Sequence, residues 1–252
     1  MEKIPISVVI ITKNEEQNLP ACLESVRWAK EIVIVDDEST DRTFEIARAY
    51  TDKIFIRQMD VEGKQRNFAL AQATQGWILI LDADERASPE LEEELTQVVA
   101  RDGVFAGYAI PIRTLLGRRW IKAAGYYPAT RMRFFRRDYL RYEETGVHPR
   151  VFLNGKRAFL RGEIIHYGYR NVTHFIDKLN HQTTLEARKW VEDGRYVSWF
   201  KILFKMCERF CRNYFGKKGI TDGFLGFLMS AFHSIYQFFT YEKYLELKRS
   251  ER

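Results

Sequence analysis

Apolar and polar positions change along the first ninety residues in a way that predicts alternating strands and helices. Three apolar, mostly β-branched runs have the length of buried strands: residues 6–12, 32–35 and 78–81. Residues 53–57 predict a further short strand. The intervals between them show the helical spacing of apolar residues, at 14–28, 42–50 and 63–74. This succession predicts an α/β fold built on a doubly wound, mostly parallel sheet.

Carboxylates follow two of the predicted strands. Asp36 and Asp37 come directly after residues 32–35, and Asp82 and Asp84 follow residues 78–81. Because parallel strands end at one edge of the sheet, we expect both acidic pairs to line the crevice in which open α/β folds bind ligands. The oxygens of Asp82 and Asp84 suit Mg²⁺ or Mn²⁺, which hold a diphosphate while keeping some of their waters. A solvated acidic turn ahead of a helix is the alternative.

Several segments carry a resemblance to a known family. Four of them resemble, in this order, the motifs of family 2 glycosyltransferases of GT-A fold and together cover roughly residues 4–90: 8–14, 33–41, 63–67 and 81–85. Residues 146–148 and 164–167 are similar to a narrower branch that includes the β-1,4-glucosyltransferases of lipopolysaccharide core assembly. That branch commonly has Val-His-Glu, whereas this chain has Pro149 after the histidine. The resemblance implies a GT-A domain that binds a nucleotide-sugar donor.

The resemblance also implies which residues bind the nucleotide. Thr12 and Asn14 would line the nucleotide pocket. Asp37, supported by Asp36, would accept the N3–H of a uracil-type base, which favours a UDP-sugar. Three residues of the predicted helix at 63–74 would contact the nucleotide or its phosphates: Lys64, Arg66 and Asn67. An exposed helix N-terminus is the alternative for these three.

A metal-dependent, inverting transfer is the reaction that the resemblance implies. Asp84, with Asp82 in support, would hold the Mg²⁺ or Mn²⁺ that neutralises the departing diphosphate. An inverting transfer also needs a general base for the acceptor hydroxyl. Glu144 is preferred over Glu143 for this role, because it lies nearer to residues 146–148.

Two histidines and a basic stretch leave alternatives open. His148 would be a third metal ligand or would orient a phosphate, and His166 has the same two roles. For each of them, a structural histidine is the alternative. Residues 113–137 hold eight Lys or Arg and no acid. This stretch either attracts an acceptor that carries phosphate or carboxylate groups, or forms a solvated face paired with the acidic residues 90–94.

Charge and aromatic side chains concentrate in the C-terminal part of the chain. Residues 195–252 hold 11 Lys or Arg against 5 Asp or Glu, which equals the net charge of +6 of the whole chain. We expect a GT-A domain over residues 1–170 and a helical extension over 171–252. The extension either packs on the domain or lies on the surface of an anionic bilayer, since its apolar run at 224–239 is short for a membrane span of about 20 residues. No motif in it favours nucleic-acid binding.

Length and cysteine usage complete the hypothesis. The 252 residues suffice for a full hydrophobic core. The sparse cysteines, Cys22, Cys207 and Cys211, favour reduced thiols and so a cytoplasmic protein. The first residues show no signal-peptide pattern, so we expect the protein in the cytoplasm or peripheral on the inner membrane.

The leading hypothesis is transfer of a sugar from a nucleotide-diphosphate donor to a saccharide or lipid-linked acceptor in envelope glycan synthesis. The alternatives are a sugar nucleotidyltransferase, disfavoured by the absence of glycine at residues 12–16, and a non-catalytic scaffold of the same fold.

Overall fold

The structure, a computed structural model, describes residues 3–101, 103–145 and 149–250. Their contacts divide them into two compact units. The first unit holds the residues up to Ile112 together with Thr130–His166, and the second holds Arg113–Ala129 together with the residues from Tyr167 onward. The boundary expected at residue 170 stays a prediction, while the last division between the two units falls between His166 and Tyr167. Residues 113–129, which we had assigned to the first domain, group with the helical part.

A parallel block of strands forms the centre of the first unit. It consists of β1 (Ile4–Thr12), β2 (Ala29–Asp36), β3 (Ile54–Ile56) and β4 (Trp77–Asp82), in the order β3-β2-β1-β4. The register sets Thr12 beside Asp36 and Ile11 beside Asp82. The two predicted acidic segments therefore begin at the same carboxyl edge of the sheet.

The sheet continues beyond β4 with strands that pair mostly antiparallel. After β4 come β8 (Ala129–Arg136), β6 (Gly107–Leu116), β12 (Ile164–Tyr169) and β5 (Glu85–Ala87), while β7 (Arg119–Trp120) and β11 (Arg157–Phe159) pair with β6. A separate hairpin joins β9 (Leu140–Tyr142) to β10 (Val151–Leu153). The antiparallel pairing of β12 with β5 places His166 opposite Glu85.

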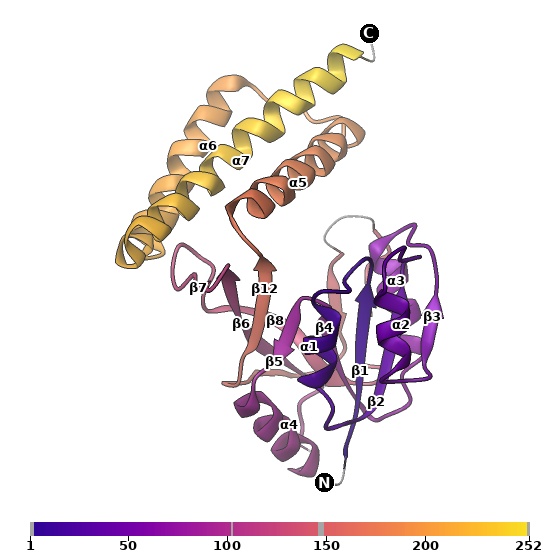
Figure 1. Cartoon of the computed structure of the whole chain (residues 1–252). Helices are drawn as coiled ribbons and strands as arrows, with labels where there is room; N and C mark the ends of the chain where they lie inside the picture. The colour runs from indigo at the N-terminus through magenta and orange to yellow at the C-terminus, as the bar shows by residue number, and fades with distance from the viewer. Residues whose placement is uncertain (1–2, 102, 146–148, 251–252) are drawn as a thin grey trace. The chain divides into compact units, whose positions relative to one another are not determined.

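Helices cover both faces of the parallel block, because alternate side chains of β1 point to opposite faces. Ile6, Val8 and Ile10 are buried in one core with residues of α1 (Leu19–Glu24), α2 (Thr43–Arg48) and α4 (Pro89–Arg101). Val9 lies in a second core with Ala69 and Leu70 of α3 (Glu62–Ala71). The elements are drawn in Figure 1. The predicted α/β architecture is confirmed.

The second unit is mainly helical, as predicted for the C-terminal region. Its long helices are α5 (Val172–Glu192), α6 (Trp199–Cys211) and α7 (Gly223–Ser250), with a π-helical turn η1 (Arg212–Gly216) and a 3-10 turn η2 (Gly219–Asp222) before α7. Both α5 and α6 pack on α7. A Cβ atom on Gly226 would lie 1.8 Å from the carbonyl oxygen of Gly219, so only glycine allows this close approach. Within the described ranges, none of the helices is long and apolar enough to cross a membrane.

Candidate active site

Asp36 and Asp37 are buried at the carboxyl edge of β2 and held mainly by neutral donors. Asp37 Oδ1 accepts the backbone N–H of Met59 (2.7 Å) and Oδ2 accepts the ammonium of Lys13 (2.9 Å). Asp36 accepts the N–H of Ser39 (3.0 Å) and its hydroxyl (2.5 Å). Each carboxylate oxygen can accept two hydrogen bonds, so this pair keeps acceptor capacity for a further donor.

Asn14 and Thr12 lie at the end of β1, beside the Asp36–Asp37 pair. Asn14 has a positive φ of 53°, and its amide oxygen accepts the N–H of Thr40 (2.8 Å). Its own N–H donates to the hydroxyl of Ser39 (2.8 Å). Thr12 Oγ1 is buried and has no hydrogen-bond partner among the described residues. A buried hydroxyl of this kind is a natural place for a ligand to complete the hydrogen bonding.

Asp82 is neutralised by two guanidinium groups. Arg133 donates to Asp82 Oδ2 and to Glu85 Oε1, both at 2.7 Å, and Arg66 lies 3.4 Å from Asp82 Oδ1. The other oxygen of Glu85 accepts the backbone N–H of Asp82 (2.8 Å). These four residues form one network at the end of β4.

The network shifts the pKa values of its members in opposite directions. Burial alone would raise the pKa of Asp82, but the positive charges of Arg133 and Arg66 hold it well below its ordinary range. Burial raises the pKa of Glu85 to about 7, although Arg133 opposes this effect. The two carboxylates raise the pKa of Arg133 despite its burial, so this guanidinium stays charged.

Asp84 lies beside His166. His166 Nε2 is 3.3 Å from Asp84 Oδ2, and both side chains are largely buried. Burial would lower the pKa of His166, but the hydrogen bond to Asp84 and the charges of Asp84, Glu85 and Asp82 raise it above its ordinary value. Across the described ranges, no group of three or more His, Cys, Asp or Glu is arranged to hold a metal ion. The pair offers one carboxylate and one imidazole donor, which suits a cation that completes its shell with diphosphate oxygens and water.

Of the three residues predicted on α3, only Arg66 reaches the acidic network. It also pairs with Glu62 (2.9 Å), and its guanidinium lies 5.5 Å from the ring centre of Tyr142. Asn67 exchanges two hydrogen bonds with the backbone of Tyr142, at 2.8 and 3.0 Å, and so holds β9 against α3. Lys64 lies 3.6 Å from Asp60 and is half exposed.

Glu143 and Glu144 lie on a loop that packs against the N-terminus of α3. Gly63 N–H donates to the carbonyl of Thr145 (3.2 Å), and a Cβ atom on Gly63 would lie 1.8 Å from the carbonyl oxygen of Glu143. Glu143 Oε2 accepts the N–H of Arg150 at 3.4 Å. The Glu144 side chain is exposed. His148, predicted as a third metal ligand, lies outside the described residues.

Arg133 and Glu85 are the residues whose part in the site we did not predict. Arg133 belongs to the basic stretch at 113–137, which we expected to face the acceptor or the solvent, yet its side chain is only 11% exposed. Arg136 from the same stretch donates to the carbonyl of Gly103 (2.9 Å) and lies over the ring of Trp77. The acidic residue Glu85, next to Asp82 and Asp84, is the feature of the sequence that could have predicted a buried arginine, because buried carboxylates at a strand end require a buried cation.

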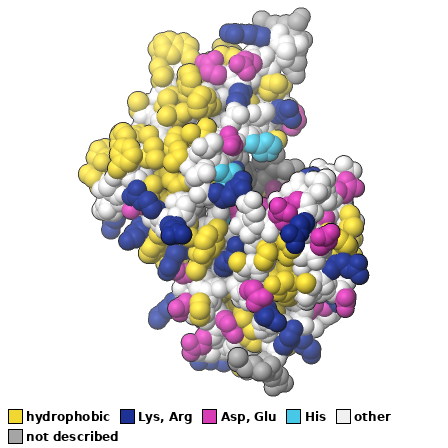
Figure 2. Space-filling model, viewed as in Figure 1, with side chains coloured by type: hydrophobic (Ala, Val, Ile, Leu, Met, Phe, Trp, Pro, Cys, Tyr) yellow, Lys and Arg dark blue, Asp and Glu magenta, His cyan; other side chains and the backbone are white. Residues whose placement is uncertain are grey.

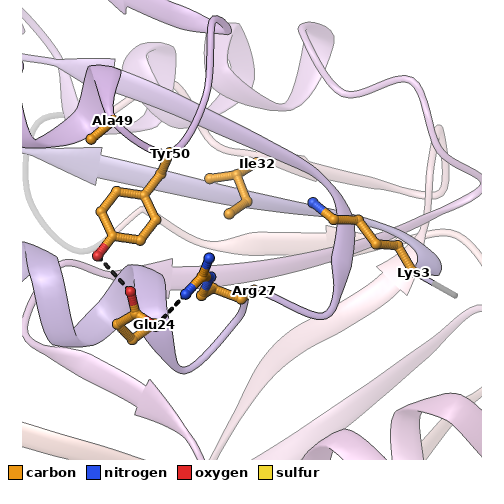
Figure 3. A pocket seen from close by; sticks show the side chains of 6 residues that line it. All are labelled: Lys3, Glu24, Arg27, Ile32, Ala49 and Tyr50. Atoms are coloured by element: carbon orange, nitrogen blue, oxygen red, sulfur yellow. Dashed lines mark hydrogen bonds and ion pairs between the residues drawn. The ribbon is translucent and has the colours of Figure 1, made fainter. Parts of the chain in front are cut away.

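A surface cavity of about 500 Å³ lies elsewhere on the first unit and is shown in Figure 3. It opens near the start of β1 and β2 and is lined by Lys3, Glu24, Arg27, Ile32, Ala49 and Tyr50. Three of its polar side chains bind one another, since Glu24 accepts from Tyr50 (2.7 Å) and from Arg27 (3.3 Å). We therefore place the candidate site at the acidic edge of the sheet.

The parallel block, its acidic carboxyl edge and the antiparallel continuation through β8 define a GT-A fold. The sequence profile described as Glycosyl transferase family 2 matches residues 7–161. The chain belongs to this family and is a glycosyltransferase.

Similar proteins share most of the length of this chain. The lipopolysaccharide core biosynthesis glycosyltransferase LpsC of Rhizobium meliloti is 32% identical over 96% of this chain and 92% of its own length. An uncharacterized glycosyltransferase of Rickettsia typhi is 28% identical over 98% of this chain and 89% of its own. The crystal structure of S. aureus TarS 1-349 superposes with a TM-score of 0.48 at 18% identity, over 74% of this chain and 65% of that one. This chain therefore spans slightly less than two thirds of the TarS fragment.

Proposed function

We propose that the protein is an inverting glycosyltransferase of cell-envelope glycan synthesis. It would move a sugar from a nucleotide-diphosphate donor to a saccharide or lipid-linked acceptor of the lipopolysaccharide type. The observation that carries the proposal is the Asp84–His166 pair, 3.3 Å apart, beside an Asp82 that two arginines neutralise. The relative LpsC, named for lipopolysaccharide core biosynthesis, supports this choice of glycan.

The nucleotide would bind along the ends of β1 and β2. Asp37 retains acceptor capacity for the N3–H of a uracil-type base, which makes a UDP-sugar the favoured donor. Asp36 fixes the turn at Ser39 and acts as support. The buried Thr12 hydroxyl and Asn14 would complete the pocket. Arg66 would face the donor phosphates, while Asn67 keeps the neighbouring strand in place.

A divalent cation fits beside Asp84. Asp84 and His166 would hold Mg²⁺ or Mn²⁺, which supplies positive charge for the departing diphosphate when bound. Asp82 has a cationic partner on each oxygen, so it would act as a positioning residue through Arg133 and Arg66. This assignment places the main metal contact on Asp84, with the arginines sharing the neutralisation of the leaving group.

Glu144 would be the general base. Its side chain is exposed, and no hydrogen bond or ion pair joins it to another described residue. Glu143 is less suited, because its carboxylate accepts the N–H of Arg150. Deprotonation of the acceptor hydroxyl as it attacks the anomeric carbon in line would give inversion. The reaction would take place in the cytoplasm, at the inner face of the inner membrane when the acceptor is lipid-linked.

Incubation with labelled UDP-, GDP- and dTDP-sugars tests the proposal. We expect slow hydrolysis that releases the nucleoside diphosphate, fastest with a UDP-sugar and dependent on a divalent cation. Exchange of pyrophosphate into the sugar nucleotide would instead identify a nucleotidyltransferase. If neither reaction occurs with any of the donors, the protein is a non-catalytic scaffold that has kept the fold.

A further inference from the structure

The second unit exposes a row of large apolar side chains on α6 and the start of α7. We call this surface the docking face and define it by six residues: Trp199, Phe200, Leu203, Phe204, Phe224 and Phe227. Their exposed fractions range from 44% to 73%. Figure 2 shows hydrophobic side chains gathered over this part of the unit. Exposed apolar patches of this kind mark interaction surfaces.

The docking face is a consequence of helix geometry. At about 100° per residue, Trp199, Phe200, Leu203 and Phe204 fall within an arc of roughly 140° on α6. Ile202 points away from that arc and is 2% exposed, so α6 uses its other side to pack on α7. The helix therefore has two apolar sides, and most of the side that carries Trp199 and Phe204 stays exposed among the described residues.

Aromatic rings make the docking face continuous between the two helices. Phe210, on the same side of α6 as Trp199 and Leu203, meets Phe227 edge-on at 5.8 Å between ring centres. Phe227 in turn lies 6.3 Å from Phe224. Aromatic residues are enriched where proteins meet the boundary between lipid headgroups and acyl chains.

A small basic pocket borders the docking face at the start of α6. It has a volume of about 260 Å³ and is lined by Trp190, Arg195, Tyr196, Val197, Lys201 and Lys205. Lys201 and Lys205 lie one helical turn apart, and neither forms an ion pair with another described residue. Arg195 already pairs with Asp193 (2.8 Å), so the two lysines carry the free positive charge. Their long side chains can lie along apolar surface while the ammonium groups reach an anion.

The other end of the docking face is basic as well. Lys217 and Lys218 are exposed and lie between Phe215 and Ile220, which are 60% and 53% exposed. Arg212 is balanced by Glu208 at 2.7 Å. Lysines without an ion-pair partner among the described residues therefore border the apolar surface at both ends.

We propose that the docking face and the basic pocket bind a bilayer surface that contains anionic lipid. The aromatic side chains enter the boundary between headgroups and acyl chains, and Lys201 and Lys205 bind a headgroup phosphate. A second copy of the chain fits less well, because a two-fold contact through this face would gather the positive charges of both copies at one interface. The inference deepens the proposed function, since a lipid-linked acceptor lies at such a surface, but its test does not depend on transfer activity.

Co-sedimentation of the full chain with vesicles tests the docking. We expect binding to phosphatidylcholine vesicles that contain phosphatidylglycerol and much weaker binding to phosphatidylcholine alone. Raising the salt from about 0.1 M to about 1 M should release most of the protein, because the Debye length falls from about 10 Å to about 3 Å. The double variant Lys201→Glu/Lys205→Glu should lower the apparent affinity by about tenfold or more.

Two further variants separate the contributions. Phe200→Ser/Phe204→Ser should weaken binding at low and at high salt, because it removes the apolar contact. Lys30→Glu/Arg101→Glu makes the same change in net charge at exposed sites of the first unit and should leave binding unchanged. Circular dichroism and thermal melting verify that each variant folds.

Several results would overturn the docking proposal. One is that the wild type stays in the supernatant with anionic vesicles at low salt. Another is that Lys201→Glu/Lys205→Glu binds normally, and a third is that the charge control Lys30→Glu/Arg101→Glu loses as much binding as the lysine variant. Light scattering that shows a dimer, made monomeric by Phe200→Ser/Phe204→Ser, would assign the face to a second copy instead. Donor hydrolysis is measured on the same samples without vesicles. Its absence in the wild type would contradict the proposed function and leave the docking result intact.

Discussion

Two acidic clusters stand at the carboxyl edge of one sheet, and they are neutralised in different ways. Asp36 and Asp37 are held by backbone N–H groups, a serine hydroxyl and one exposed lysine. The cluster of Asp82, Asp84 and Glu85 is held by two largely buried arginines and a histidine. Neutral donors fix the orientation of a carboxylate and leave most of its charge, whereas buried cations cancel it.

This difference indicates which kind of ligand each cluster can bind. A carboxylate oriented by short neutral hydrogen bonds is suited to accept one more neutral donor, such as a base N–H. A cluster with fixed cations is suited to a ligand that brings its own negative charge, such as a diphosphate with a metal ion. The first cluster would therefore determine donor affinity, and the second would determine turnover.

The largest expected effect comes from removing the central cation of the second cluster. Arg133→Met leaves Asp82 and Glu85 without their shared partner, and it should lower the free energy of unfolding by about 3–5 kcal/mol. Urea denaturation measures this change. Arg131→Met is the matched control, since Arg131 is exposed on the same strand and should contribute less than about 0.5 kcal/mol. Equal losses in the two variants would show that the network does not stabilise the fold.

Glu144 belongs to neither cluster, and its carboxylate has no partner among the described residues, which leaves it able to accept a proton. Glu144→Gln keeps the shape of the side chain and removes the base, so turnover should fall by roughly 10³-fold, or about 4 kcal/mol. Donor binding, measured by titration calorimetry, should stay unchanged. Glu143→Gln is the control and should keep most activity. Inactivity of the Glu143 variant, or full activity of both, would transfer the role to another residue.

Asp84→Ala tests the charge-bearing role of the second cluster. Turnover should fall by about 10²-fold, or about 3 kcal/mol, because the departing diphosphate loses its cation. Removal of divalent cations with EDTA should act on the wild type and add little to the variant. If EDTA and Asp84→Ala both leave activity intact, the metal assignment is wrong.

The parallel half of the sheet could be predicted because its signals are local. The apolar runs of β1, β2 and β4 are contiguous, and the carboxylates that follow them must lie at one edge once the strands are parallel. The carboxylates predicted at these strand ends, such as Asp37 and Asp82, lie at this edge, and their roles in binding and catalysis stay predictions. The helical C-terminal region followed from the spacing of its apolar and aromatic residues.

The antiparallel half could not be predicted, because its pairing joins residues far apart in sequence. The partnership of Asp84 with His166 depends on the register of β12 against β5. Arg133 resembled a surface residue, since composition alone does not distinguish a buried arginine from a solvated one. Its neighbours Phe134 and Phe135 are buried, and only the carboxylates across the sheet explain why the arginine is buried with them.

Another buried carboxylate of the same sheet, outside both clusters, serves as a structural reference. Glu31 of β2 accepts hydrogen bonds from Ser7 and Thr74 and pairs with Lys53. Burial would raise its pKa, but these partners lower it from 4.5 to about 2. Because the folded pKa is lowered, the stabilisation is complete above pH 4.5 and is lost as the pH falls towards 2.

Glu31→Gln should therefore destabilise the protein in a pH-dependent way. We expect a loss of roughly 2 kcal/mol at pH 7, the size of a charge-assisted hydrogen bond. The difference from the wild type should shrink between pH 4.5 and pH 2. Denaturation curves over this pH range measure it, and Glu45→Gln at an exposed ion pair is the control. A difference that is constant with pH would mean that the charge of Glu31 is not responsible.

The smallest effect is expected at the first cluster, where Asp37→Asn keeps the shape but replaces the negative charge and one acceptor oxygen with an amide NH₂ group. We expect the affinity for UDP to fall by about tenfold, equivalent to about 1.4 kcal/mol, with little change in turnover at saturating donor. Calorimetric titration with UDP measures the affinity, and Asp52→Asn at an exposed position is the control. This outcome would be the reverse of Asp84→Ala, which lowers turnover more than nucleotide affinity. If Asp37→Asn instead lowers turnover while UDP binds normally, the division of roles between the two clusters fails, because the first cluster would then act on the departing diphosphate.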